Sequence, residues 1–479
     1  MIVTRAAAWA SARVFLGIRS MKQESLFGFA QDLKPAIELD GLFEAYFDCR
    51  NNKRNTLNAL AFEVDYEANL LKLCAEINNG SYRPGKSIAF IVNKPIKREI
   101  FAADFRDRVV HHLIVNKLNP LFEKAFIYDS YACRAAKGTH LGIKRVDRFI
   151  RQCSQNYTKD SYVLKLDVKA FFMHINKTLL LSELQAFIEQ KYQSADKELL
   201  LELCQKTIVY DPTQNCIVKS KRREWQGLPP DKSLFHSAIH CGLPIGNLTS
   251  QVFANFYMNP FDHFIKHDLG IRYYGRYVDD FVLVHQDKEY LKSLVPLIKT
   301  TLQDRLQLTL HPKKIYLQHY SKGVQFLGAV IKPNRIYIAN RTKGNFYTAI
   351  TKQNALVKEH KPGKEQQAVF LSSMNSYLGI MKHYKTHKLR KRMLFKKLSG
   401  WWWDRVYLSG GIAKFVLKEK PGVLSLCIFI YLASLAATRL YFNGPLQVII
   451  SFFLSFVPQS EFRLCLCLPA GLFGGCGNY

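Results

Sequence analysis

The sequence predicts an α+β protein of several subdomains, and three observations lead to this prediction. The chain has 479 residues, of which 48% are hydrophobic, so it can form at least one substantial core. Residues 161–168 and 272–285 are rich in β-branched and apolar side chains and are predicted to form strands. A further segment, with Asp287 as a candidate cap, is predicted to be an amphipathic helix. Its apolar stripe comprises Leu291, Leu294, Ile298 and Leu302.

A turn punctuated by glycine and proline, residues 242–246, is predicted between these strand segments. The helix that follows it would be capped by Asn247 or Thr249. It would bury Phe253 and Tyr257, which are four residues apart and therefore lie on one face.

The net charge is strongly positive, because 68 Lys and Arg outnumber 38 Asp and Glu and give a formal charge of +30. Such an excess attracts polyanions, so nucleic acid is the leading expected partner and an anionic membrane surface is the rival. From Pro421 onward the only charged residues are Arg439, Glu461 and Arg463, so the basic field belongs to the first 420 residues.

The two ends differ from the middle of the chain. Residues 1–20 contain three arginines and no acid, which suggests either an organellar presequence or a start codon upstream of the true one at Met21. The apolar runs 423–437 and 446–457 are shorter than the roughly 18 residues expected of a spanning helix, so a membrane anchor is the less favoured alternative to a buried tail. The eleven cysteines include no CxxC pair, which indicates free thiols in a reducing cytosol.

Acidic residues stand at the ends of the predicted strands. Asp167 ends the first strand segment, and Asp279-Asp280 lies between the two apolar arms of a predicted hairpin. One such hairpin alone would be an ordinary turn, but carboxylates gathered from separate strands repel unless cations lie between them. Mg²⁺ prefers oxygen ligands, and two such ions about 4 Å apart can promote in-line phosphoryl transfer.

These residues resemble the sequence motifs of reverse transcriptases. Tyr277-Val-Asp-Asp280 resembles the signature box of that family, and the other boxes occur in the expected order over about residues 30 to 400. The palm motifs are similar at 165–172, 242–251, 310–314 and 326–328. The fingers motifs are similar at 97–98, 105–108 and 131–140.

The resemblance implies a right-hand polymerase fold with α+β fingers, a palm built on an antiparallel sheet, and a helical thumb. The expected organisation runs from an N-terminal extension to a hydrophobic tail. Its parts are the extension 1–20, the N-terminal helices and fingers 21–160, the palm 161–340 with a fingers-side insertion at about 176–240, the basic helical thumb 341–405, and the tail 406–479.

The resemblance also implies the catalytic roles. Asp167 and Asp279 would bind two Mg²⁺ ions, for which Mn²⁺ could substitute, and Asp280 would support the site. Val168 would contribute its backbone to the metal site, where it would contact the triphosphate. Lys314 would protonate the departing pyrophosphate, with Lys313 as the competing assignment.

Nucleotide-binding residues follow from the same resemblance. Lys97, Arg98 and Arg134 would hold the incoming triphosphate, because cations neutralise its charge. Phe172 would exclude the 2′-hydroxyl of a ribonucleotide, although a Phe after a strand can also simply belong to the core. In the turn before the next helix, Ile245 and Gly246 would face the nascent base pair.

A basic run with eight cations and no acid extends from Met381 to Gly400. Such a run is usually a solvated face. Its place after the 326–328 box favours a thumb that holds the duplex backbone, with Lys388, Arg390 and Arg392 as the binding residues.

The expected reaction is Mg²⁺-dependent extension of a DNA or RNA primer by dNTPs on an RNA template. The form Leu-Pro-Ile-Gly-Asn-Leu-Thr-Ser-Gln at 243–251 is similar to diversity-generating retroelement enzymes, which implies error-prone copying and a small basic accessory protein. The alternatives are a phage-defence or group II intron-like reverse transcriptase, a membrane-tethered defence factor, and a non-catalytic RNA-binding protein. A cytoplasmic protein of bacterial or phage origin is expected.

Overall fold

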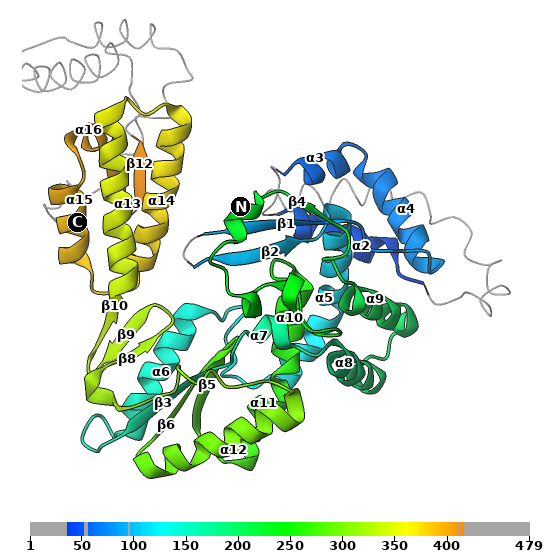
Figure 1. Ribbon diagram of the computed structural model, residues 1–479, viewed down its shortest axis with the longest axis horizontal. Helices are drawn as coiled ribbons and strands as arrows, with labels where there is room; N and C mark the ends of the chain where they lie inside the picture. Colours follow the sequence, from blue (N-terminus) through cyan, green and yellow to red (C-terminus); the bar gives the residue numbers. More distant parts are fainter. Residues whose placement is uncertain (1–35, 52–55, 94–95, 410–411, 416–479) are drawn as a thin grey trace, which may run out of the picture. The chain divides into compact units, whose positions relative to one another are not determined.

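A computed structural model describes residues 36–51, 56–93, 96–409 and 412–415 (Figure 1). The chain divides into two compact units. The first extends to Tyr347 and includes Met381–His387, and the second comprises Thr348–Ile380 and the chain from Lys388 onward. The expected presequence at 1–20 and the apolar runs at 423–437 and 446–457 lie outside the described residues. No helix within the described ranges is both long and apolar enough to cross a bilayer.

The centre of the first unit is a four-stranded antiparallel sheet in the order β5-β6-β3-β7. Its strands are β5 (Tyr273–Tyr277), β6 (Asp280–His285), β3 (Tyr162–Asp167) and β7 (Tyr316–His319). The two predicted strand segments and the predicted hairpin are confirmed, because β5 and β6 pair around the turn at 278–279. The α+β class with an antiparallel palm sheet is therefore confirmed as well.

Side chains alternate between the two faces of this sheet, as the pleat requires. Leu164, Leu166 and Phe281 on one face join the main core, which also contains residues of α10 (Leu248–Tyr257) and α12 (Lys288–Leu306). Val163 and Val282 on the other face pack in a second cluster. That cluster includes residues of α6 (Thr139–Cys153), β8 (Val324–Phe326) and β9 (Ala329–Lys332), and β9 pairs with β10 (Arg335–Ile338).

The helix α12 confirms its prediction, because the Asp287 carboxylate accepts hydrogen bonds from the backbone N–H groups of Glu289 and Tyr290. The four residues of its predicted stripe are all buried. The predicted cap of α10 is wrong. Asn247 does precede that helix, but its side-chain oxygen accepts from the backbone N–H of Ala103 at 3.0 Å, so Asn247 ties the helix to the fingers.

The fingers contain a three-stranded sheet in the order β2-β1-β4. The strands β1 (Ser87–Val92) and β2 (Arg98–Ala102) are antiparallel, and β4 (Cys216–Val218) pairs in parallel with β1. Because β4 belongs to the predicted insertion at 176–240, this part of the insertion completes the fingers sheet. The chain then crosses the fingers through three short 3₁₀ turns, at Arg222–Trp225, Pro230–Lys232 and Leu234–His236.

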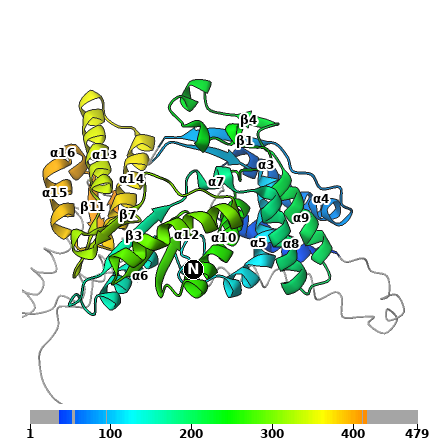
Figure 2. The same ribbon diagram turned by 60° about the horizontal axis from the view of Figure 1, so that its bottom comes forward.

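Helices pack around the long buried helix α5 (Phe105–Ala125). They are α2 (Leu39–Arg50), α3 (Leu57–Val64), α4 (Tyr66–Asn78), α8 (Lys177–Lys191) and α9 (Lys197–Val209). Figures 1 and 2 show α8 and α9 side by side. Shorter helices in this unit are α7 (Phe171–His174), α11 (Asn259–His263) and a π-helical turn at Phe264–Asp268.

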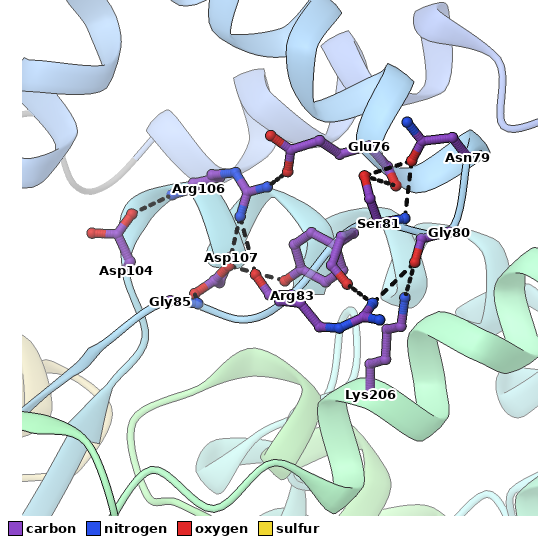
Figure 3. Close-up of polar contacts among 11 residues, drawn as sticks. Glu76, Asn79, Gly80, Ser81, Arg83, Gly85, Asp104, Arg106, Asp107 and Lys206 are labelled. Carbon is purple, nitrogen blue, oxygen red and sulfur yellow. Dashed lines mark hydrogen bonds and ion pairs between the residues drawn. The ribbon is translucent and has the colours of Figure 1, made fainter.

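The motif at 105–108 anchors the start of α5 (Figure 3). Asp104 caps the helix by accepting from the backbone N–H of Arg106. The buried Asp107 carboxylate accepts from the Tyr82 hydroxyl at 2.9 Å and from the Gly85 backbone N–H at 2.8 Å. Burial raises the pKa of Asp107, and these donors oppose the rise. Arg106 pairs with Glu76 at the end of α4, so this motif joins two helices and a loop.

The second unit is built from helices and one small hairpin. It contains most of α13 (Asn340–Glu359) and α14 (Lys364–Lys382), then α15 (His387–Lys397), α16 (Gly400–Trp403), β11 (Val406–Ser409) and β12 (Ile412–Phe415). Its core includes Trp402, which is fully buried and stacks on Phe370 with ring centroids 3.8 Å apart.

Candidate active site

Three carboxylates converge at one end of the palm sheet. Asp167, the last residue of β3, lies opposite Asp280, the first residue of β6, in the antiparallel ladder. Asp279 occupies the turn before β6, and its carbonyl accepts from the backbone N–H of Val168 at 3.2 Å. The ladder therefore places all three acids together, although more than 110 residues separate Asp167 from the other two.

The turn that carries Asp279 is held by a buried ion pair. Val278 has φ +56°, a left-handed conformation that is rare for a β-branched residue. Its carbonyl accepts from the Arg276 guanidinium at 2.9 Å. Arg276 also binds Asp262 through two hydrogen bonds of 2.7 and 2.6 Å, and both side chains are 0% exposed. This pair compensates the strain at Val278 from beneath the turn.

The carboxylates repel one another electrostatically. Burial, together with the negative charges of Asp167 and Asp280, raises the pKa of Asp279 to about 7. Burial also raises the pKa of Asp280, while Lys165 opposes that rise. Such mutual perturbation is typical of carboxylates arranged for function and not for stability.

Two lysines balance part of this charge. The Lys314 ammonium donates to both carboxylate oxygens of Asp167, at 2.8 and 2.9 Å. Lys165 lies 3.3 Å from an oxygen of Asp280. Burial acts to lower the pKa of Lys314, but the bond to Asp167 and the negative charges of the three carboxylates together outweigh it, so the pKa is raised. Lys313 and Lys314 are both exposed, but of the two only Lys314 bonds to Asp167, and the assignment of the proton donor stays a prediction.

The residues fit a magnesium site. Within the described part of the chain, no three His, Cys, Asp or Glu side chains are arranged as a ready-made metal cage. Mg²⁺ does not need one, because it is usually held by one or two carboxylates together with substrate phosphates. Asp167 and Asp279 supply such oxygens, and their unbalanced negative charge favours a cation between them.

Phe172 and the turn at 242–246 meet beside the fingers sheet. Phe172 and Ile245 are half-buried and pack against one small cluster of buried residues, namely Ala89, Phe101, Met173 and Leu234. The Ile245 carbonyl accepts from the backbone N–H of Phe101 at 2.9 Å. Gly246 has φ +127°, and a Cβ there would lie 2.8 Å from Ile100, so only glycine fits.

The three predicted triphosphate ligands differ in what they contact. Arg98, at the start of β2, is exposed. Burial raises the pKa of Tyr277, and the positive charge of Arg98 opposes part of this rise. Lys97 donates to the backbone carbonyl of Gln226 at 2.7 Å.

Arg134 is bonded to Glu123 of α5 and to backbone carbonyls near its own loop. Its side chain is 4% exposed, and its nitrogens donate to Glu123 and to the carbonyls of Ile127 and Ser130. These bonds hold the loop that carries Arg134. The triphosphate contacts of Lys97, Arg98 and Arg134 stay predictions.

The predicted nucleic-acid ligands lie on α15 in the second unit. Lys388 and Arg392 are exposed, whereas Arg390 is half-buried. The helix is anchored by Met393 and Leu394, which are both buried. The exposed cations of α15 are therefore free of the core.

Sequence reasoning missed four residues of this region. Lys165 could have been found, because it lies two positions before Asp167 on a strand and so on the same face. The Arg276–Asp262 pair has no such local signal, since a basic residue beside a turn is common. Glu99, a buried acid of β2, was likewise not singled out.

A comparison with protein families identifies this domain. The family described as reverse transcriptase (RNA-dependent DNA polymerase) matches residues 94–331, which include all three acids. This segment therefore belongs to the reverse transcriptase family, and the predicted enzyme class, an RNA-directed DNA polymerase and thus a nucleotidyltransferase, is confirmed. The diversity-generating branch stays a prediction.

Particular relatives share only part of the chain. Protein YkfC of Escherichia coli K12 is 22% identical over 287 residues, which are 53% of this chain and 68% of YkfC. An apo telomerase of Candida tropicalis is 14% identical, with a TM-score of 0.39, over 53% of this chain and 55% of its own. The telomerase of Candida albicans, solved with a fragment of telomeric RNA, is 12% identical, with a TM-score of 0.39, over 68% and 64%. This chain thus spans between 55% and 64% of the length of these telomerases.

Proposed function

We propose that this chain copies RNA into DNA by Mg²⁺-dependent extension of a primer 3′-hydroxyl with dNTPs. The observation that carries the proposal is the meeting of Asp167, Asp279 and Asp280 with the ammonium of Lys314 inside a reverse transcriptase domain. Carboxylates that would bind cations and a lysine that can give up a proton are the groups that phosphoryl transfer requires.

Each residue has a chemical task in this proposal. Asp167 and Asp279 would hold Mg²⁺, which when bound activates the primer hydroxyl and neutralises charge on the leaving group. Lys314 keeps its proton in the resting site, where Asp167 accepts from it, and would donate that proton to the pyrophosphate oxygen. Arg98 would bind the triphosphate, and Phe172 would lie beneath the sugar.

Primer extension tests this proposal directly. The purified chain is incubated with a labelled primer annealed to a defined RNA, with dNTPs and Mg²⁺. Products whose length and sequence follow the template, and whose formation stops when EDTA is added and resumes with excess Mg²⁺, would support it. A chain that binds the RNA but extends no primer under any divalent metal would instead be a non-catalytic RNA-binding protein.

The exposed cations of α15 are predicted to bind the template–primer backbone. Replacing Lys388 and Arg392 by Gln should weaken binding and reduce the slope of log affinity against log salt by about 2 units, since each phosphate contact contributes about 0.9. A salt titration of fluorescence anisotropy measures this slope.

The control replaces Lys292 and Lys299, two exposed lysines of α12, by Gln. This variant has the same charge change and should keep the wild-type slope. If both double variants shift the slope equally, the effect reflects net charge and α15 has no special role.

We further propose the error-prone branch, on the form of residues 243–251. The half-buried Ile245 side chain has no group that can hydrogen-bond a nucleotide, so it can select only by shape, which discriminates weakly. Ile245→Gln should lower the error rate opposite templating adenine by roughly tenfold. Sequencing of cDNA made on a defined RNA measures this rate, and Ile245→Leu is the apolar control. An unchanged error spectrum in an equally active Gln variant would contradict this assignment.

A further inference from the structure

The loop between β4 and α10 is fastened to the fingers by one buried acid. Glu99 of β2 is 1% exposed, and its carboxylate accepts hydrogen bonds from three groups of this loop. These are the Trp225 indole N–H at 2.7 Å, the Ser233 hydroxyl at 2.8 Å and the Leu234 backbone N–H at 2.6 Å. No cation among the described residues forms an ion pair with Glu99.

A buried carboxylate without a cation must be stabilised by hydrogen bonds, because burying an unsatisfied polar group is costly. Bonds to an ionised acceptor are stronger than neutral ones, so the three donors are held firmly. All three come from residues 126–135 positions away in the chain. Glu99 therefore determines where residues 225–234 lie on the fingers sheet.

Leu234 connects this attachment to the nucleotide-binding region. It is a member of the buried cluster against which Phe172 and Ile245 pack. The turn is fitted closely to it, because a Cβ on Gly242, where φ is +96°, would lie only 2.6 Å from the Leu234 side chain. The backbone N–H of Leu243 in turn donates to the Phe172 carbonyl at 2.8 Å. Leu234 thus lies close to the turn and belongs to the cluster against which the Phe172 ring packs.

We propose that Glu99 is a positioning residue for sugar discrimination. Glu99 holds Leu234 against β2 and so keeps in place the buried cluster on which Phe172 packs. The Phe172 ring then stays where it would exclude a 2′-hydroxyl. This inference rests on the proposed function and assigns to it a buried residue outside the acid cluster.

Single-nucleotide incorporation tests the inference. The ratio of kcat/KM for a dNTP to that for the matching rNTP is measured on one RNA template for the wild type, Glu99→Ala and Glu99→Gln. We expect Glu99→Ala to lower the ratio about tenfold, the scale of one lost shape contact in a pocket. Glu99→Gln should lower it less, because the amide oxygen still accepts but the amide nitrogen cannot.

Three further variants make the result specific. Glu224→Gln is the matched control. Among the described residues that carboxylate accepts only from Ser220 and Lys221 of its own loop, so the ratio should not change. Phe172→Ala should lower the ratio itself, and adding Glu99→Ala to it should lower it little further. Trp225→Phe removes one donor and keeps an aromatic ring, so it should shift the ratio about twofold even if Glu99→Ala fails to fold.

The outcomes separate the two proposals. A Glu99 or Trp225 variant that slows dNTP and rNTP incorporation equally overturns the positioning role, while the proposed function survives. A wild-type ratio retained by Phe172→Ala also overturns it, because the sugar would then be selected elsewhere. A wild-type chain that extends no primer overturns the proposed function and this inference together.

Discussion

Asp279→Asn should reduce primer extension roughly a thousandfold while leaving the fold intact. Asparagine has the shape of aspartate but no charge, so the site would lose several kcal/mol of cation binding, and each 1.4 kcal/mol corresponds to about tenfold in rate. The melting temperature without added metal should not fall, because the substitution removes one of three mutually repelling carboxylates. Single-turnover extension and a thermal melt measure the two quantities.

The matched control for this prediction is Asp268→Asn. Asp268 is exposed and lies outside the acid cluster, so the same chemical change there should leave extension unaltered. Extension by Asp279→Asn within a few-fold of the wild type would show that Asp279 does not hold the metal.

Arg276→Met should be the most destabilising single change in the palm. It leaves Asp262 as an unpaired charge at a position that is 0% exposed, which costs about 3–5 kcal/mol in the free energy of unfolding. It also removes the hydrogen bond to the Val278 carbonyl, so the turn that carries Asp279 loses its support. Urea denaturation measures the stability change, and primer extension measures the effect on the site.

A second substitution separates the two roles of Arg276. Arg276→Met combined with Asp262→Asn buries no unpaired charge, and the Asn oxygen can still accept from the Tyr274 hydroxyl, so much of the stability should return. Extension should remain at least about tenfold reduced, because the Val278 carbonyl still lacks its donor and Asp279 is less well positioned. Wild-type extension by this double variant would show that the bond to Val278 is dispensable.

Local sequence patterns were sufficient to predict the central strands of the palm and the helix α12. The β-branched and apolar residues of 161–168 and 272–285 predicted β3, β5 and β6, and the acids at their ends predicted the cluster. Asp287 and the stripe after it predicted α12 together with its cap. These predictions succeeded because a strand or helix displays its period and its end signals within a few residues.

The partners of individual polar side chains were decided only by the tertiary structure. Arg134 is a basic residue like any other in the sequence, and only the fold places Glu123 beside it. Asn247 is a suitable helix cap, but its side-chain oxygen accepts a hydrogen bond from the backbone N–H of Ala103 in the fingers instead. Which partner such a side chain bonds depends on donors and acceptors from distant parts of the sequence. A short stretch of sequence does not contain them.

What the sequence by itself determined about this protein is therefore the order of its elements, the acids at the strand ends and the resemblance that the family match to residues 94–331 bears out. Only the tertiary structure decided that Lys314 and not Lys313 reaches Asp167, that Arg276 supports the turn at 278–279, and that Glu99 holds a loop of the insertion. The physical reason is that secondary structure follows from periodicity within one segment. Buried polar groups, in contrast, must find donors and acceptors wherever the folded chain supplies them.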